Sequence, residues 1–196
     1  MILKRTFHSV GHGAFYTEQF YQDAALQPCL TVIFDCGRFE AAKGGWSYKQ
    51  YKDAIEHYVS VDSGLIPGQT IDLLFISHFH TDHILGIEYL LENYDVKKIV
   101  MPVMTTEAIL DSLSTSYEED NYITEVLSFF MKLYEKYKQK ICTIDIQDIR
   151  SFDEDIDEID ILNEEFSGIS TITKGALLKY QGWYYKPYYK VDWAKE

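Results

Sequence analysis

The feature that most constrains the fold is an apolar run at residues 71–76, which reads Ile-Asp-Leu-Leu-Phe-Ile. A run of this length after the turn signal Pro67-Gly68 is typical of a β-strand buried on both faces of a sheet. Such a strand needs a covering layer on each side, which favours an α/β fold. The residues that follow, beginning with Ser77 and His78, are then expected in a loop at the carboxyl end of that strand.

Hydrophobic periodicity extends this pattern along the chain. Further strands are predicted at residues 2–8, 14–21, 30–34, 98–102 and 141–146, and amphipathic helices at residues 47–59, 84–91 and 123–137. We expect Thr81 or Asp82 to cap the second of these helices. Residues 176–180 and 183–189 are expected to form a hairpin that turns at Gln181-Gly182. Because the sequence shows neither a repeat nor a linker, residues 1–196 are interpreted as one domain.

Composition and charge argue against several functional classes. Hydrophobic residues make up 46% of the chain and charged residues 25%, which is typical of a globular protein. The net charge of −13 disfavours general binding to nucleic acids and to anionic membranes. A cytoplasmic location without membrane attachment is expected, since the sequence shows no apolar leader and no membrane-spanning run. The three cysteines, Cys29, Cys36 and Cys142, lack C-x-x-C spacing and are interpreted as reduced, buried thiols.

The candidate site is the run His78-Phe79-His80-Thr81-Asp82-His83. In extended backbone, His78 and His80 point to the same side, so both imidazoles are able to bind one metal ion. Asp82 and His83 begin the next helix and offer a carboxylate and an imidazole to a second ion nearby. Each residue alone is more simply explained as a surface histidine or a helix cap. Four such residues within one six-residue run favour a site for zinc or another divalent transition metal.

This run resembles the signature H-x-H-x-D-H of the metallo-β-lactamase superfamily and matches it at every fixed position. Two other features are similar to the family: the strand that ends in Phe34-Asp35-Cys36-Gly37, and Gly86 after the motif. The opening Val10-Gly11-His12-Gly13 and residues 71–78 are especially similar to the hydrolase domain attached to competence DNA-uptake channels. The resemblance covers about residues 1–102 and implies an αββα sandwich, with the metal site at one edge of two sheets.

The resemblance also implies roles for individual residues. One ion would be held by His78 and His80 and the other by Asp82 and His83, with zinc as the metal and manganese or iron as alternatives. A metal-bound hydroxide would attack a phosphodiester, ester or amide, while Asp82 orients that hydroxide and takes up a proton.

Two residues outside the motif are implied as well. Asp35 is implied as a carboxylate behind the ligands that steadies them, with a strand-end turn residue as the alternative. His12 lies in a glycine turn near the metal edge, as a substitute ligand or substrate contact or, alternatively, as an exposed turn histidine.

The second half of the chain departs from the family pattern. All six histidines lie within the first 83 residues, whereas the family adds histidines and a bridging aspartate from later in the chain. The carboxylates available for that bridge are Asp145, Asp148 and Asp192, none of them in a family context. Residues 103–196 are therefore interpreted as a divergent or truncated second half. We expect the missing ligands to come from another polypeptide or from sequence outside this chain.

Three functional hypotheses follow. The first is a metallohydrolase whose late ligands are supplied in this way, and the second is a non-catalytic binding or regulatory subunit that keeps a partial metal site. The third is a di-iron redox protein, which would also need late ligands that are missing here. The aromatic C-terminal segment is expected to bind a complementing chain or a second copy of this one, unless it packs on the chain's own core. Its aromatic residues are Trp183, Tyr184, Tyr185, Tyr188 and Tyr189.

Overall fold

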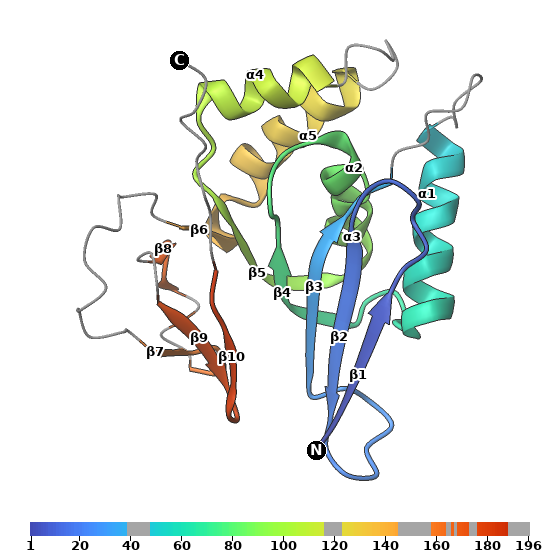
Figure 1. Ribbon diagram of the computed structural model, residues 1–196, viewed down its shortest axis with the longest axis vertical. Helices are drawn as coiled ribbons and strands as arrows, with labels where there is room; N and C mark the ends of the chain where they lie inside the picture. Colours follow the sequence, from blue (N-terminus) through green and yellow to red (C-terminus); the bar gives the residue numbers. More distant parts are fainter. Residues whose placement is uncertain are drawn as a thin grey trace.

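A seven-stranded sheet with the strand order β1-β2-β3-β4-β5-β6-β8 forms the centre of the computed structural model (Figure 1). The structure describes residues 1–38, 48–115, 123–144, 158–163, 166, 168–172 and 176–187. The strands of this sheet are β1 (Ile2–Phe7), β2 (Phe15–Tyr21), β3 (Leu30–Cys36), β4 (Thr70–Phe75), β5 (Asp95–Pro102), β6 (Ile141–Ile144) and β8 (Thr171–Ile172). The first three strands pair antiparallel, whereas β3 to β6 and β8 run parallel. Because parallel strands end at the same edge, the loops after β3 and β4 are neighbours there.

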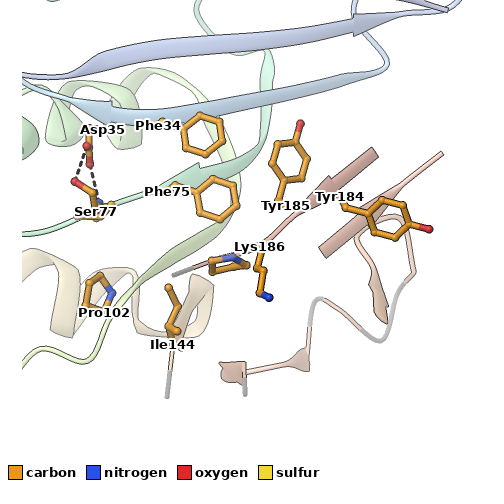
Figure 2. Close-up of a pocket in the computed structure, with 11 residues that line it drawn as sticks. Phe34, Asp35, Phe75, Ser77, Pro102, Ile144, Tyr184, Tyr185 and Lys186 are labelled. Atoms are coloured by element: carbon orange, nitrogen blue, oxygen red, sulfur yellow. Dashed lines mark hydrogen bonds between the residues drawn. The ribbon is translucent and has the colours of Figure 1, made fainter. Parts of the chain in front are cut away.

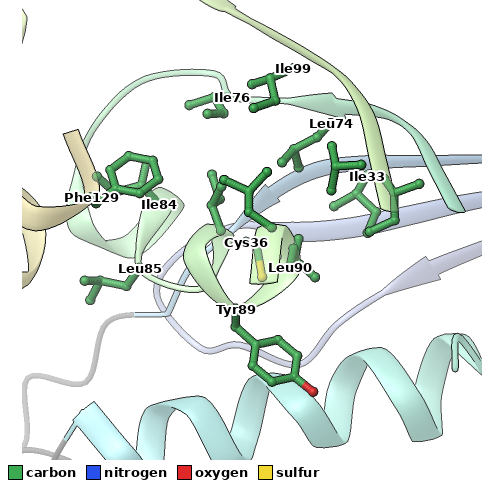
Figure 3. Close-up of a cluster of buried hydrophobic side chains, with 14 of the residues drawn as sticks. Ile33, Cys36, Leu74, Ile76, Ile84, Leu85, Tyr89, Leu90, Ile99 and Phe129 are labelled. Atoms are coloured by element: carbon green, nitrogen blue, oxygen red, sulfur yellow. The ribbon is translucent and has the colours of Figure 1, made fainter. Parts of the chain in front are cut away.

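Helices cover one face of this sheet. They are α1 (Tyr48–His57), which continues into a π-helical turn (Tyr58–Ser63), then α2 (Thr81–Ile84), α3 (Ile87–Asn93), α4 (Thr106–Thr115), α5 (Ile123–Lys136) and a 3-10 turn (Lys138–Lys140). Side chains alternate along a strand, so Ile33, Leu74 and Ile99 of the sheet all point to this side. They share one buried cluster with helix residues that include Leu90 and Phe129 (Figure 3).

A three-stranded sheet with the order β10-β9-β7 covers the other face. It consists of β7 (Glu158–Asp160), β9 (Leu177–Tyr180) and β10 (Trp183–Tyr185). Between the sheets, Val32, Leu73 and Val100 of the large sheet form a second buried cluster with Leu178 and Tyr180. The mixed α/β fold with two sheets that the sequence predicted is therefore confirmed. In the part of the chain that the structure describes, the helices α1 to α5 all contribute to the first cluster and so form the helical layer on the large sheet.

Some predicted boundaries around the motif are wrong. The helix expected at residues 84–91 is split into α2 and α3, because the chain turns at Gly86, whose amide donates a 2.7 Å hydrogen bond to the Cys36 carbonyl. The predicted capping by Thr81 or Asp82 is also wrong. The residue before α2 is His80, and no side-chain hydrogen bond caps the helix. β5 begins earlier than predicted.

The predicted C-terminal hairpin is confirmed. β9 and β10 pair antiparallel, and Gln181 (φ 43°) and Gly182 (φ 88°) form the left-handed two-residue turn that joins them. Residues 188–189 of the predicted second strand, and residues 145–146 of the strand predicted at 141–146, lie outside the described residues.

All three cysteines are free thiols; Cys36 and Cys142 are buried as predicted, whereas Cys29 is half-buried. In the part of the chain that the structure describes, no helix combines the length and the apolar character needed to cross a membrane.

Candidate metal centre

The histidine motif lies at the carboxyl edge of the large sheet, as the sequence predicted. β3 and β4 are adjacent parallel strands, and Phe34 pairs with Phe75 near their ends. Asp35 therefore comes from the end of β3, while His78 follows β4 after a short loop. The chain then enters α2, which carries Asp82 and His83. Two neighbouring strand ends and one short helix thus bring together residues that are far apart in the sequence.

Three motif residues form a compact group of possible metal ligands. One nitrogen or oxygen atom from each of His78, Asp82 and His83 lies within 4.8 Å of the others, and all three residues are half-buried. Nε2 of His83 is 3.6 Å from Oδ2 of Asp82, and the centroids of the His78 and His83 imidazole rings are 3.9 Å apart. Two imidazoles and one carboxylate form a donor set that catalytic zinc sites use, so the residues present fit such an ion.

His80 stands beside this group. Its ring centroid is 4.6 Å from that of His78, and it is half-buried like the three others. The sequence prediction assigned His78 and His80 to one ion and Asp82 and His83 to another. The structure instead gathers His78 with Asp82 and His83, which suits a single ion with His80 next to it. The division of the four residues between two ions stays a prediction.

The Asp35 carboxylate lies directly behind His83. Its Oδ2 atom is 2.9 Å from Nδ1 of His83, and the residue is 5% exposed. If Nδ1 donates its proton to this carboxylate, the lone pair of Nε2 is left free on the side that faces Asp82. The backbone of Asp35 has a φ of 52°, a left-handed conformation that aspartate tolerates better than most residues. This arrangement places Asp35 where the resemblance implied a steadying carboxylate.

Ser77 belongs to the site, although the sequence analysis assigned it no role. Its backbone amide donates to Oδ1 of Asp35 at 2.8 Å, and its hydroxyl donates to Oδ2 at 2.7 Å. The same hydroxyl oxygen is 2.9 Å from Nδ1 of His78. Ser77 therefore links Asp35 to both imidazoles of the group. The available signal was a hydroxyl residue placed between a buried strand and the first histidine.

The two imidazoles differ in their affinity for protons. Burial and the nearby His83 and His80 lower the pKa of His78. Burial acts in the same direction on His83, but the hydrogen bond and charge of Asp35, with the charge of Asp82, outweigh it and raise the pKa of His83. A metal ion needs neutral imidazole ligands, so binding at this group has to displace a proton from His83 when the solution is acidic.

Close backbone packing fixes the loop that carries the ligands. The Asp82 carbonyl accepts a 3.1 Å hydrogen bond from the Ala14 amide, and the Ala14 carbonyl accepts one of 3.0 Å from the Gly37 amide. A Cβ atom at Gly37 would overlap the backbone of Asp82 and His83, and one at Gly13 would come within 2.5 Å of the Asp82 carbonyl oxygen. Glycine is required at these positions because two loops approach the metal loop this closely.

The other predicted site residues are placed as follows. His12 lies in the adjacent turn, but its side chain is exposed and it is not a member of the three-residue group. Asp145, Asp148 and Asp192, considered as bridging carboxylates, lie outside the described residues.

In the described part of the C-terminal aromatic segment, Tyr185 packs on the chain's own sheets, whereas Trp183 and Tyr184 remain exposed. The Tyr185 hydroxyl donates a 2.7 Å hydrogen bond to Glu18 of β2. The Trp183 ring is 5.6 Å from Phe20 and remains 37% exposed, while Tyr184 is 47% exposed. Tyr188 and Tyr189 lie outside the described residues.

This segment also closes one side of a cavity of about 330 Å³ next to the metal group. Asp35 and Ser77 line the end near the histidines, and residues 184–187 form part of the opposite wall (Figure 2). The cavity thus adjoins the candidate ligands at the carboxyl ends of the parallel strands, where open α/β sheets bind their ligands.

Comparison with known proteins agrees with this geometry. The family model described as Metallo-beta-lactamase superfamily matches residues 30–175, which is more than half of the chain. The chain is also 30% identical over 115 residues to the cleavage and polyadenylation specificity factor subunit 3-I of Arabidopsis thaliana. That match covers 58% of this chain but 15% of the relative, so the chain spans only a small part of that protein's length. No solved structure matched the chain. On the match over residues 30–175, the chain belongs to the metallo-beta-lactamase superfamily.

Proposed function

We propose that this chain is a metal-dependent hydrolase in which His78, Asp82 and His83 hold one divalent transition metal, with zinc preferred. The observation that carries the proposal is the convergence of three ligand atoms within 4.8 Å at the carboxyl edge of the sheet. Three protein ligands with one position left for water or substrate are typical of catalytic zinc. Manganese and iron are alternative metals, since imidazole and carboxylate ligands also suit them. Membership of the superfamily supports a hydrolytic role.

Each residue has a distinct part in this proposal. When bound, the metal lowers the pKa of water and polarises the bond to be cleaved. Asp82 accepts the proton that the attacking water gives up, since its carboxylate is among the three ligand-forming groups and is partly exposed. Asp35 holds the His83 ring in place through its 2.9 Å contact with Nδ1, and Ser77 holds Asp35. His80 provides a further imidazole beside His78.

The substrate we propose is a phosphodiester, with an ester or amide as the alternative. The relative from Arabidopsis is named for cleavage and polyadenylation, which supports a phosphodiester, although the chain spans 15% of that protein. The likeness of residues 71–78 to the hydrolase domain of competence DNA-uptake channels also favours this class. The net charge of −13 argues against a broad polynucleotide-binding surface, so we expect a small substrate or a short end of a longer one.

A second metal ion would require ligands beyond this group. We propose that a complementing chain, a second copy of this one, or sequence outside this chain supplies them when two ions are bound. The partial exposure of Trp183 and Tyr184 supports a contact through the C-terminal segment. The three free thiols support a cytoplasmic location for this assembly.

The second candidate is a non-catalytic binding or regulatory subunit with the same fold. The observation that favours it is the absence of any histidine after His83 in the sequence. The two candidates differ in one result: only the hydrolase cleaves a phosphodiester when zinc is added.

The test combines metal content and activity in the full chain. We expect the parent to bind one zinc ion and to hydrolyse bis(p-nitrophenyl) phosphate, and His78→Ala and His83→Ala to lose most of both. In both variants the zinc affinity should fall by more than roughly 10- to 100-fold, which is the usual effect of removing a group that only supports a ligand. His57→Ala is the matched control, because His57 is exposed at the end of α1. Zinc binding without hydrolysis would favour the regulatory subunit, and unchanged zinc content in both variants would contradict the metal centre.

A further inference from the structure

The cavity beside the metal group has a lining of a definite chemical kind. Aromatic and apolar side chains make up most of its wall, including Phe34, Phe75, Ile144, Tyr184 and Tyr185. Polar side chains gather at one end, where Asp35 and Ser77 already bond to each other. In Figure 2 that end lies on one side of the phenylalanine rings and the C-terminal segment lies on the other. A wall of this composition favours an apolar group with a polar part at the Asp35 and Ser77 end.

The aromatic rings of this wall are ordered relative to one another. Phe34 and Phe75 stack with their centroids 4.7 Å apart and an angle of 8° between the ring planes. The Tyr185 ring lies 6.0 Å from Phe34 and 5.8 Å from Phe75, tilted toward both. Rings at these separations offer faces and edges to another flat ring. The cavity is therefore better suited to a planar aromatic group than to a flexible chain.

A buried carboxylate holds this wall in place. Glu18 is 4% exposed and accepts a 2.9 Å hydrogen bond from Nε of Arg5, and it also accepts hydrogen bonds from the hydroxyls of Tyr16 and Tyr185. The contact with Tyr185 joins β2 to β10 across 167 residues of sequence. Because each carboxylate oxygen has a partner, the Tyr185 ring is fixed before any ligand arrives, which lowers the entropic cost of binding.

We propose that this cavity binds a planar aromatic ring of the substrate, while the anionic ester attached to that ring lies at the His78, Asp82 and His83 group. The assignment rests on the proposed hydrolase function and narrows its substrate to aromatic phosphate esters, of which nucleotides and simple aryl phosphates are two sources. The volume is sufficient, since an apolar cavity of about 150 Å³ is known to hold benzene and this one measures about 330 Å³.

The test measures binding of three phosphate monoesters, the class of product that hydrolysis of a phosphodiester releases, to the full chain, both zinc-loaded and after chelation. The probes are adenosine 5′-monophosphate, phenyl phosphate and ribose 5-phosphate, and the method is saturation-transfer NMR with calorimetry for affinities. We expect at least one of the two aromatic probes to bind at least about fivefold more tightly than ribose 5-phosphate in both states, because stacking on aromatic side chains contributes to affinity. A preference for the nucleotide over phenyl phosphate identifies a nucleobase as the ring, and equal binding of the two identifies any aryl group.

Two variants assign the binding to this cavity. Phe34→Leu should remove most of the aromatic preference, and the matched control Phe7→Leu should keep it, because Phe7 is 78% exposed on β1 and does not line the cavity. Ile144→Phe should also remove most of the aromatic preference, because the larger side chain fills part of the cavity. This second variant keeps the test decisive if Phe34→Leu fails to fold.

The possible failures can be told apart. The assignment would be overturned by equal affinity for all three probes, or by an aromatic preference that persists in folded Phe34→Leu and Ile144→Phe variants. In either case, zinc-dependent hydrolysis would still support the proposed function. A chain that binds the rings as expected but takes up no zinc would contradict the metal centre and leave the cavity as a binding site for aromatic anions.

Discussion

The Asp35 carboxylate lies 2.9 Å from Nδ1 of His83, although 48 residues separate the two in sequence. This contact joins the end of β3 to α2 and sets which nitrogen of His83 faces Asp82. It depends on Ser77, which donates to both carboxylate oxygens of Asp35. The ligand geometry therefore depends on residues that are not themselves members of the ligand group.

We predict that Asp35→Asn lowers zinc affinity by roughly 10- to 100-fold, the usual effect of removing a carboxylate behind a histidine ligand. Asparagine replaces one of the two carboxylate oxygens with an NH2 group, so it cannot accept from the Ser77 amide, the Ser77 hydroxyl and His83 together as the carboxylate does. Calorimetric titration with zinc measures the change. Asp23→Asn serves as control, because Asp23 is exposed at the surface. Equal affinities in the two variants would show that Asp35 does not position His83.

We predict that Gly37→Ala destabilises the fold by about 1–3 kcal/mol and also removes bound zinc. The new methyl group would overlap the backbone of Asp82 and His83, so the ligand loop has to move. Urea unfolding and metal content report the two effects separately. Gly168→Ala is the matched control, since a Cβ atom there meets nothing within 4 Å. A stable Gly37→Ala variant with full zinc content would contradict the packing described for this loop.

We predict that Asp82→Asn keeps the fold and lowers the rate of hydrolysis by at least about 100-fold, because the amide cannot accept a proton and is a weaker metal ligand than the carboxylate. Its size is nearly unchanged, so the thermal unfolding midpoint should remain close to that of the parent. Asp53→Asn makes the same chemical change at an exposed position on α1 and should leave the rate unaffected. Activity within a few-fold of the parent would exclude Asp82 as the proton acceptor.

His8 provides a prediction about pH that is independent of the metal. Burial lowers its pKa from 6.5 to about 4, against the opposing effect of Asp62, while Lys4 adds to the lowering. Its Nε2 atom bonds to the hydroxyls of Thr17 and Ser63 at 2.9 and 3.1 Å, so the neutral ring, which directly follows β1, links this part of the chain to β2 and the π-helical turn.

The pKa of His8 is 6.5 in the unfolded chain and about 4 in the folded chain. Between these two values, His8 takes up a proton more readily in the unfolded chain than in the folded chain. The contribution of His8 to stability is therefore fully present above pH 6.5 and is lost as the pH falls toward 4, with a slope of at most about 1.4 kcal/mol per pH unit. Urea unfolding across this range measures the slope, and His8→Gln should flatten it, whereas the exposed His57→Gln should not. Identical slopes in parent and His8→Gln would contradict the buried, neutral state of His8.

The parts of the fold that the sequence predicted are those determined by local pattern. The apolar run before Ser77 and the motif from His78 to His83 are contiguous, so the strand, the loop after it and the place of the candidate ligands in the fold followed from periodicity and spacing. The break at Gly86 was missed because it depends on a contact with Cys36 from another strand. Periodicity within one segment carries no information about such a partner.

The missed features of the site are also long-range contacts. The hydrogen bond between Tyr185 and Glu18 spans 167 residues, and the packing of Gly37 against Asp82 joins two loops. A tyrosine or a glycine in the sequence does not indicate which residue it will contact, because both residue types occur in many other contexts. The grouping of His78 with Asp82 and His83 likewise depends on the turn of the chain into α2, which the His-x-His spacing alone does not determine.

The most direct test of the metal centre is a crystal structure of the zinc-loaded chain with anomalous data collected at the zinc absorption edge. We expect one strong peak bound by His78, Asp82 and His83, at about 2.0–2.2 Å from each ligand atom, with Asp35 still bonded to Nδ1 of His83. A peak that lies away from these three residues, or no peak at full zinc loading, would contradict it.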